Sequence, residues 1–159
     1  MIRELMVNGA KNIPANYAAK VAMVTGMGVQ VDYKNGQVIL PAAETATGIE
    51  LVAHEFVPTG LKASLTNFDD YDEDVTKIEA GDLVKQVPMY AGELYGVDQY
   101  KETDIKEANI GKVLSVFTDG KWQVAGSSIS SRYEFAGIMD DNGHKLAMIS
   151  VLPEAKTNS

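Results

Sequence analysis

The sequence predicts an all-β protein, an antiparallel small barrel or sandwich built from hairpins, with an N-terminal arm and at most one or two short helical turns. Three observations predict this fold class. Asn-Gly or Asp-Gly pairs occur three times between runs in which apolar and polar residues alternate, and such pairs favour the tight turns of β-hairpins. The 14 glycines mark turns at short intervals. No segment has a sustained helical period.

Three hairpins are the clearest elements. In each of them, apolar and polar residues alternate beside the turn, as they do in a half-buried strand. An Asn-Gly pair suits a type I′ turn, because both central residues of that turn need φ > 0. The paired segments are 29–33 with 37–40 around Asn35-Gly36, 113–117 with 121–124 around Asp119-Gly120, and 135–139 with 146–152 around Asn142-Gly143.

Weaker strand patterns fill much of the remaining chain. Four further segments are rich in apolar residues and bounded by turn residues, and Ala91-Gly92 joins the last two. The segment 78–82 is typical of a turn that leads into a strand. The four predicted strands are 19–24, 48–56, 83–90 and 93–99.

Helix is predicted only as single turns. Asp104 and Glu107 have the spacing of a capping box ahead of one turn that ends at Gly111. The segment 13–20 has Pro14 at a position that can begin a helix. Both segments are too short to be architectural helices, so the fold class is unchanged.

The domain organisation follows from shifts in composition. The segment 1–19 lacks clear periodicity and is predicted as an N-terminal arm, followed by a β domain over 20–152. Five of the six residues from 69 to 74 are acidic, which disfavours a strand and suggests a sub-boundary at 67–75. The tail 153–159 has no apolar anchor and is predicted to be mobile. Whether the β domain forms one barrel or two stays open.

Composition excludes several classes of function. The chain has 159 residues, a formal net charge of −8 and no cysteine, so a disulfide framework and thiolate chemistry are excluded. The 14 basic residues are scattered, which argues against a nucleic-acid partner. No apolar run reaches the roughly 18 residues of a membrane span, and the N-terminal residues do not resemble a secretory signal. The sequence therefore predicts neither a nucleic-acid nor a membrane partner.

Motifs that would mark an active site are incomplete. His54-Glu55 begins a zinc-protease motif, but Pro58 stands where the second histidine is needed. The P-loop and nucleophile-elbow patterns are missing from the sequence. We therefore expect no catalytic residue, no cofactor, no metal site and no enzyme. A hydrolase or metal enzyme that uses His54, His144 and the acidic segment is the least favoured of three functional hypotheses.

The acidic segment also resembles part of a calcium-binding loop. Asp70, Asp72 and Asp74 match the first three ligand positions of an EF-hand. However, Val75 replaces the required glycine, and Gly81 replaces the required glutamate. An EF-hand is therefore excluded, whereas looser calcium binding by 69–74 stays open.

Apolar residues beyond the needs of a small core indicate a protein-protein interface. The segment 146–149 is apolar on both faces, as in a strand that is central in the fold or covered by another chain. The predicted arm is also apolar, and aromatic residues lie on or next to the predicted strands. The predicted partner-binding residues are Met1, Ile2, Leu5, Met6, Val7, Tyr95, Trp122, Leu146 and Met148.

Three stretches, 77–84, 91–97 and 137–139, resemble small β-rich structural proteins of tailed bacteriophage virions. Capsid decoration (cement) proteins and related auxiliary head proteins are the most similar class. The resemblance implies a non-enzymatic protein on the outer capsid surface of the virion, made in the host cytoplasm. Its partners would be the major capsid protein and copies of itself, for instance in a trimer. A role at a fibre base or as another auxiliary component stays open.

The second hypothesis is a β-barrel module that binds a carbohydrate or another small ligand. In this interpretation Trp122 and the tyrosines line an aromatic groove. Nothing in the sequence separates a groove of this kind from aromatic residues that pack a core.

Overall fold

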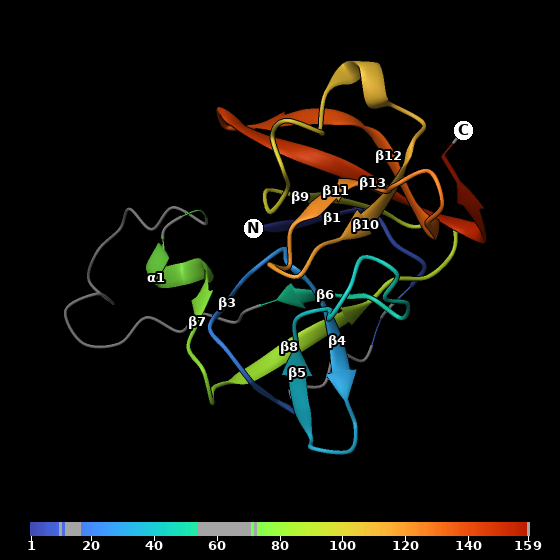
Figure 1. Ribbon diagram of the computed structural model, residues 1–159. Helices are drawn as coiled ribbons and strands as arrows, with labels where there is room; N and C mark the ends of the chain where they lie inside the picture. Colours follow the sequence, from blue (N-terminus) through green and yellow to red (C-terminus); the bar gives the residue numbers. More distant parts are fainter. Residues whose placement is uncertain (10, 12–16, 54–70, 72, 159) are drawn as a thin grey trace.

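The computed structural model describes residues 1–9, 11, 17–53, 71 and 73–158. It confirms the all-β class, with a six-stranded sheet packed against a closed five-stranded barrel (Figure 1). The short helix α1 (Glu73–Thr76) and the 3-10 turn η2 (Glu107–Asn109) lie outside these two β units. The protein therefore combines the predicted small barrel with an open sheet.

The sheet is antiparallel throughout, in the order β1-β9-β13-β12-β10-β11. Its long central hairpin, drawn in orange and red in Figure 1, is the most extensively paired part of the sheet. The strands are β1 (Ile2–Met6), β9 (Leu94–Val97), β10 (Val113–Val116), β11 (Trp122–Val124), β12 (Ser130–Asp141) and β13 (His144–Thr157).

The barrel closes in the order β2-β5-β4-β6-β8. Its strand pairs are antiparallel except β2–β5, which is parallel. A separate two-stranded ribbon of β3 (Met23–Val24) and β7 (Lys77–Ile78) lies beside it. The barrel strands are β2 (Tyr17–Ala19), β4 (Gly28–Asp32), β5 (Gln37–Ile39), β6 (Glu50–Ala53) and β8 (Leu83–Pro88).

The three predicted hairpins are confirmed as β4–β5, β10–β11 and β12–β13. In the β12–β13 turn both central residues have positive φ, 54° at Asn142 and 87° at Gly143. These angles match the type I′ turn that an Asn-Gly pair favours.

The β4–β5 turn differs because a side chain stabilises another backbone conformation. The Asp32 carboxylate accepts hydrogen bonds from the N–H groups of Lys34 and Asn35, at 3.1 and 3.2 Å. Such bonds favour a right-handed turn, and Gly36 alone takes a positive φ there, 63°. The type I′ prediction for this turn is therefore wrong, although the strand pairing is right.

The segments predicted as 83–90 and 93–99 form β8 and β9, but these strands do not pair with each other. The chain passes from the barrel to the sheet between them, at 89–93. The chain also crosses from the sheet to the barrel between β1 and β2, whereas the predicted sub-boundary at 67–75 falls between the barrel strands β6 and β8 in the sequence. The predicted strand 19–24 is interrupted after Ala19, and the parts of 13–20 and 48–56 at 13–16 and 54–56 lie outside the described residues.

The predicted single turn near Gly111 is present as η2, but its capping box is not. Lys106 occupies the N-cap position, and no side chain caps the turn. The Asp104 carboxylate instead accepts a hydrogen bond from the Thr103 hydroxyl at 3.0 Å.

The segment predicted as an N-terminal arm is part of the fold. Strand β1 pairs with β9 at the sheet edge, with Ile2 opposite Val97. Met1 is buried, and its ammonium donates to the Thr25 carbonyl and to Asp98, both at 2.5 Å. A bulge at Leu5 breaks the alternation of the strand, so the sequence pattern there does not indicate a strand.

The tail, predicted to be a mobile segment, instead extends β13 to Thr157. The Asn158 side chain bonds both backbone groups of Val113, at 2.7 and 3.0 Å, and also the Ala125 carbonyl at 2.7 Å. Pro153 lies where the β12–β13 register shifts, so its missing N–H does not break the ladder.

The barrel and the sheet share one of the two hydrophobic cores. The shared core contains Leu51 and Val87 from the barrel together with Trp122 and Phe135 from the sheet. Contact is close at Gly28, where a Cβ atom would lie 2.4 Å from a Val116 methyl. The second core fills the barrel and consists of Ala19, Met23, Val29, Val38, Val52, Ile78 and Val84.

Candidate functional site

Four of the nine predicted partner-binding residues lie in the core instead of at the surface. Met1, Tyr95, Trp122 and Leu146 are buried in the monomer, so they cannot contact a partner in this conformation. Their apolar side chains complete the core of the sheet, which the sequence pattern could not distinguish from an interface. Of the remaining five, Ile2, Val7 and Met148 are half-buried, and Leu5 and Met6 are exposed.

Trp122 is a core residue and not part of a groove. Its side chain is 0% exposed, its indole N–H donates to the Gly26 carbonyl at 3.3 Å, and its ring packs edge-on against Tyr133. The predicted aromatic groove around Trp122 is therefore wrong, because this residue anchors the sheet to the barrel.

One exposed apolar surface lies at the β1 edge of the sheet, and we call it the edge patch. It consists of Leu5, Met6 (57% exposed) and Tyr90 (54% exposed). Met6 pairs with Leu94 across the β1–β9 ladder, and the Asn8 side chain donates to the Ala91 carbonyl. These contacts hold the end of β1 beside the turn that carries Tyr90.

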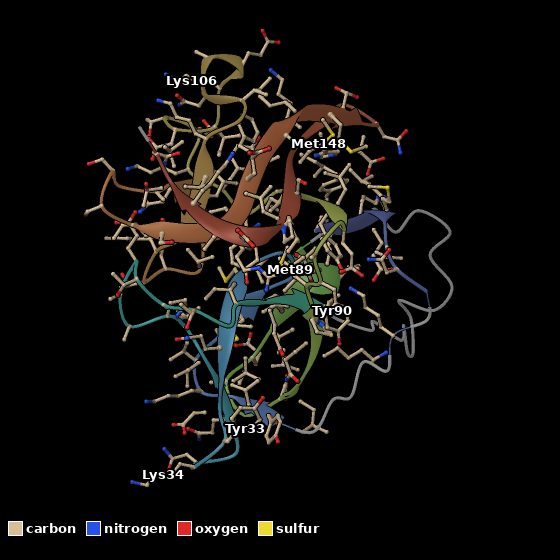
Figure 2. The ribbon with its side chains drawn as sticks, turned by 90° about the vertical axis from the view of Figure 1, so that its right-hand side faces the viewer. Tyr33, Lys34, Met89, Tyr90, Lys106 and Met148 are labelled. Atoms are coloured by element: carbon tan, nitrogen blue, oxygen red, sulfur yellow. The ribbon has the colours of Figure 1, made fainter. Side chains whose placement is uncertain are left out.

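A second exposed apolar surface, the tip patch, lies at the end of the barrel. It consists of Tyr17, Tyr33 (75% exposed) and Leu83 (61% exposed). The rings of Tyr17 and Tyr33 meet edge-to-face with centroids 6.0 Å apart, and Ala18 pairs with Leu83. Figure 2 shows Tyr33 at the far end of the barrel, well removed from Tyr90.

A buried ion pair fixes the chain next to the edge patch. The Lys11 ammonium lies 2.5 Å from a Glu93 carboxylate oxygen and also donates to the Tyr95 hydroxyl and the Pro88 carbonyl. The Tyr95 hydroxyl donates to the same carboxylate at 2.6 Å. The side chains of Lys11 and Glu93 are only 5% and 0% exposed, so the ion pair is shielded from solvent.

The electrostatics of this network favour a permanently charged Glu93. Burial alone would raise the pKa of its carboxyl, but hydrogen bonds from Lys11, Tyr95 and the backbone lower that pKa to about 2. Burial and the neighbouring carboxylate raise the pKa of the Tyr95 hydroxyl. Every donor is satisfied, which is typical of a structural network rather than of a reactive one.

Only one of the two histidines, His144, can be placed in the structure. His144 stacks on Tyr71 with ring centroids 3.8 Å apart, and the Tyr71 hydroxyl donates to Asp141 at 2.8 Å. Asp141 also accepts from the Arg3 side chain at 2.7 Å. His54 and residues 69, 70 and 72 of the acidic segment lie outside the described residues. In the described part of the chain, no group of three or more His, Asp or Glu residues could hold a metal.

One concave surface is an open groove of about 990 Å³, between the β12–β13 turn, the β10–β11 turn and the segment after β9. Its aromatic residues are Tyr71, Tyr100, Phe117 and His144, of which Phe117 and His144 are exposed. Lysine, aspartate, glutamate and glutamine side chains line the remainder. The groove therefore offers aromatic surfaces among both hydrogen-bond donors and acceptors.

Another concave surface, which we call the junction pocket, has a volume of about 260 Å³ and lies where the barrel meets the sheet. Buried Ile49, Met89 and Val116 contribute its apolar wall. Glu44 and Glu50 line it as well. An apolar pocket with a few charged groups is a common form of binding site, and no single sequence motif marks it.

Comparison with known proteins gives no match to a family model, to a curated protein or to a solved structure. No helix in the described part of the chain is long and apolar enough to cross a membrane.

Proposed function

We propose that the protein is a non-enzymatic virion structural protein that binds the outer surface of a phage capsid and stabilises contacts between major capsid subunits. The single observation that carries the proposal is the presence of two separate exposed apolar surfaces, the edge patch and the tip patch, on one compact β body. A protein that bridges neighbouring subunits needs two contact surfaces, and a shared core keeps these two at a fixed spacing.

The energetics are consistent with such a role. Burial of apolar surface contributes about 25 cal/mol per Å², so each patch alone gives a modest contact. Many copies on one particle, or a trimer that engages several sites, would convert modest contacts into avidity. A net charge of −8 suits the outside of the shell, since packaged nucleic acid would repel it.

The test is co-sedimentation with particles from the cells that naturally make the protein, followed by imaging of those particles. We expect Leu5→Ser with Met6→Ser, and separately Tyr33→Ser with Leu83→Ser, each to weaken particle binding at least about tenfold. Lys34→Gln, next to the tip patch, is the matched control and should bind normally. Wild-type protein that never sediments with a capsid would contradict the proposal, as would unchanged binding by both double variants.

The open groove favours a second candidate function, the binding of a saccharide. Sugar rings present C–H faces that pack on aromatic rings and hydroxyls that bond to mixed polar groups, and this groove has both. A glycan array followed by calorimetry tests it. We expect Phe117→Ala to weaken binding about tenfold, and Tyr33→Ala, an exposed aromatic outside the groove, to leave affinity unchanged. Equal affinity in both variants would remove this candidate.

A further inference from the structure

The junction pocket combines an apolar wall with a charged group that lacks a partner. Glu50 begins β6, and its cross-strand neighbour Pro88 has no N–H to donate. Among the described residues no cation lies within ion-pair distance of Glu50. Burial raises the pKa of its carboxyl, and no compensating interaction opposes that effect. A ligand that brings a positive charge to a carboxylate in this position stabilises its ionised form.

A second carboxylate lies in the same pocket and is held in place. One oxygen of Glu44 accepts hydrogen bonds from the Ser115 hydroxyl at 2.8 Å and from the Gly126 N–H at 2.9 Å. Arg132 also lines the pocket, and its side-chain Nε donates to the Leu152 carbonyl at 3.0 Å. The pocket therefore carries two carboxylates, and only one of them is anchored by hydrogen bonds within the described residues.

We propose that the junction pocket is a binding site for a lysine side chain of a partner protein. The aliphatic stem of lysine would pack on Ile49, Met89 and Val116, and its ammonium would meet the carboxylates of Glu50 and Glu44. A lysine ammonium is a compact charge with three donors, so it can bond to two carboxylates at once. A basic partner is also favoured by the net charge of −8.

This inference goes beyond capsid binding, because it names a pocket and a side chain that the two apolar patches do not involve. It rests on the proposed function only in assuming a protein partner. The test uses small probes and no particle, so its failure and the failure of the co-sedimentation experiment are distinguishable.

The probes are the N-methylamides of Nα-acetyl-lysine and Nα-acetyl-norleucine, which share the aliphatic stem and differ in the ammonium. In two-dimensional NMR titrations at pH 7, we expect the lysine probe to bind saturably with a millimolar Kd and to shift the amide signals of Ile49, Glu50 and Met89. The norleucine probe should bind at least about tenfold more weakly, because it cannot pair with a carboxylate. Glu50→Gln should weaken binding of the lysine probe at least about fivefold.

Glu107→Gln is the matched control and should leave binding of the lysine probe unchanged, since Glu107 lies in the exposed turn η2, next to Lys106 at the opposite end of the molecule from Tyr33 in Figure 2. An unperturbed spectrum away from β6 would show that Glu50→Gln is folded. The proposal is overturned if neither probe binds, if both bind equally, or if Glu50→Gln keeps the wild-type affinity for lysine.

Discussion

Lys11→Met is expected to destabilise the protein by about 3–5 kcal/mol at pH 7, because removal of one partner leaves the other buried charge uncompensated. The charge in question is the Glu93 carboxylate, whose side chain is 0% exposed. Denaturant unfolding at several pH values measures the effect. Lys34→Met, at an exposed turn, is the control and should change stability by no more than about 0.5 kcal/mol.

The stabilisation that Glu93 contributes depends on pH. The folded pKa of Glu93, about 2, lies below its ordinary value of 4.5, so ionised Glu93 stabilises the wild type above pH 4.5. That contribution is lost as pH falls from 4.5 towards 2. In Lys11→Met the carboxyl can take up a proton in the folded state, so the penalty should shrink over the same interval.

A double variant separates the lost ion pair from lost packing. Glu93→Gln combined with Lys11→Met removes the buried charge, and we expect it to recover part of the stability that Lys11→Met loses. A penalty for Lys11→Met below about 1 kcal/mol at pH 7, or one that does not depend on pH, would contradict the buried ion pair.

Trp122→Ala is expected to cost about 3–5 kcal/mol of stability, the range for removal of a large buried side chain. This ring belongs to the core shared by the barrel and the sheet. Trp122→Phe should cost less, about 1–3 kcal/mol, because it keeps most of the packing but leaves the Gly26 carbonyl without its indole donor. Urea titrations followed by circular dichroism measure both.

Phe117→Ala is the matched control for Trp122, since it removes an exposed aromatic ring from the turn next to the same strand. Its effect should stay within about 0.5 kcal/mol. If Trp122→Ala proved as mild as Phe117→Ala, Trp122 would not be the anchor that its contacts indicate.

The parts of the fold that were predictable have local signals. An Asn-Gly pair specifies a hairpin through the backbone of two residues, so β12–β13 could be placed with its turn type. The type of the turn after β4 could not be predicted in this way, because its conformation depends on the Asp32 side chain. Strand β1 pairs with β9 across the whole intervening barrel, and no local pattern encodes such a distant partner.

The candidate sites were less predictable than the strands. An aromatic residue on a strand, such as Trp122, has the same sequence pattern whether it faces a groove or a core. Lys11 and Glu93 pair across 82 residues of sequence, and the pocket that Glu44 and Glu50 line is completed by residues of the sheet, Ser115 and Val116 among them. Exposure of Leu5 and Met6 was expected for an interface, but it arises from a bulge in an edge strand rather than from a free arm.

The path of the chain has a kinetic consequence. Strand β1 belongs to the sheet, the chain then builds the barrel, and only afterwards does it return as β9 beside β1. Local hairpins form quickly, whereas closure over so long a stretch is slow and entropically costly. Strand β1 is thus the natural last piece to dock and the first to detach, and two molecules that release it together could exchange it and form a domain-swapped dimer.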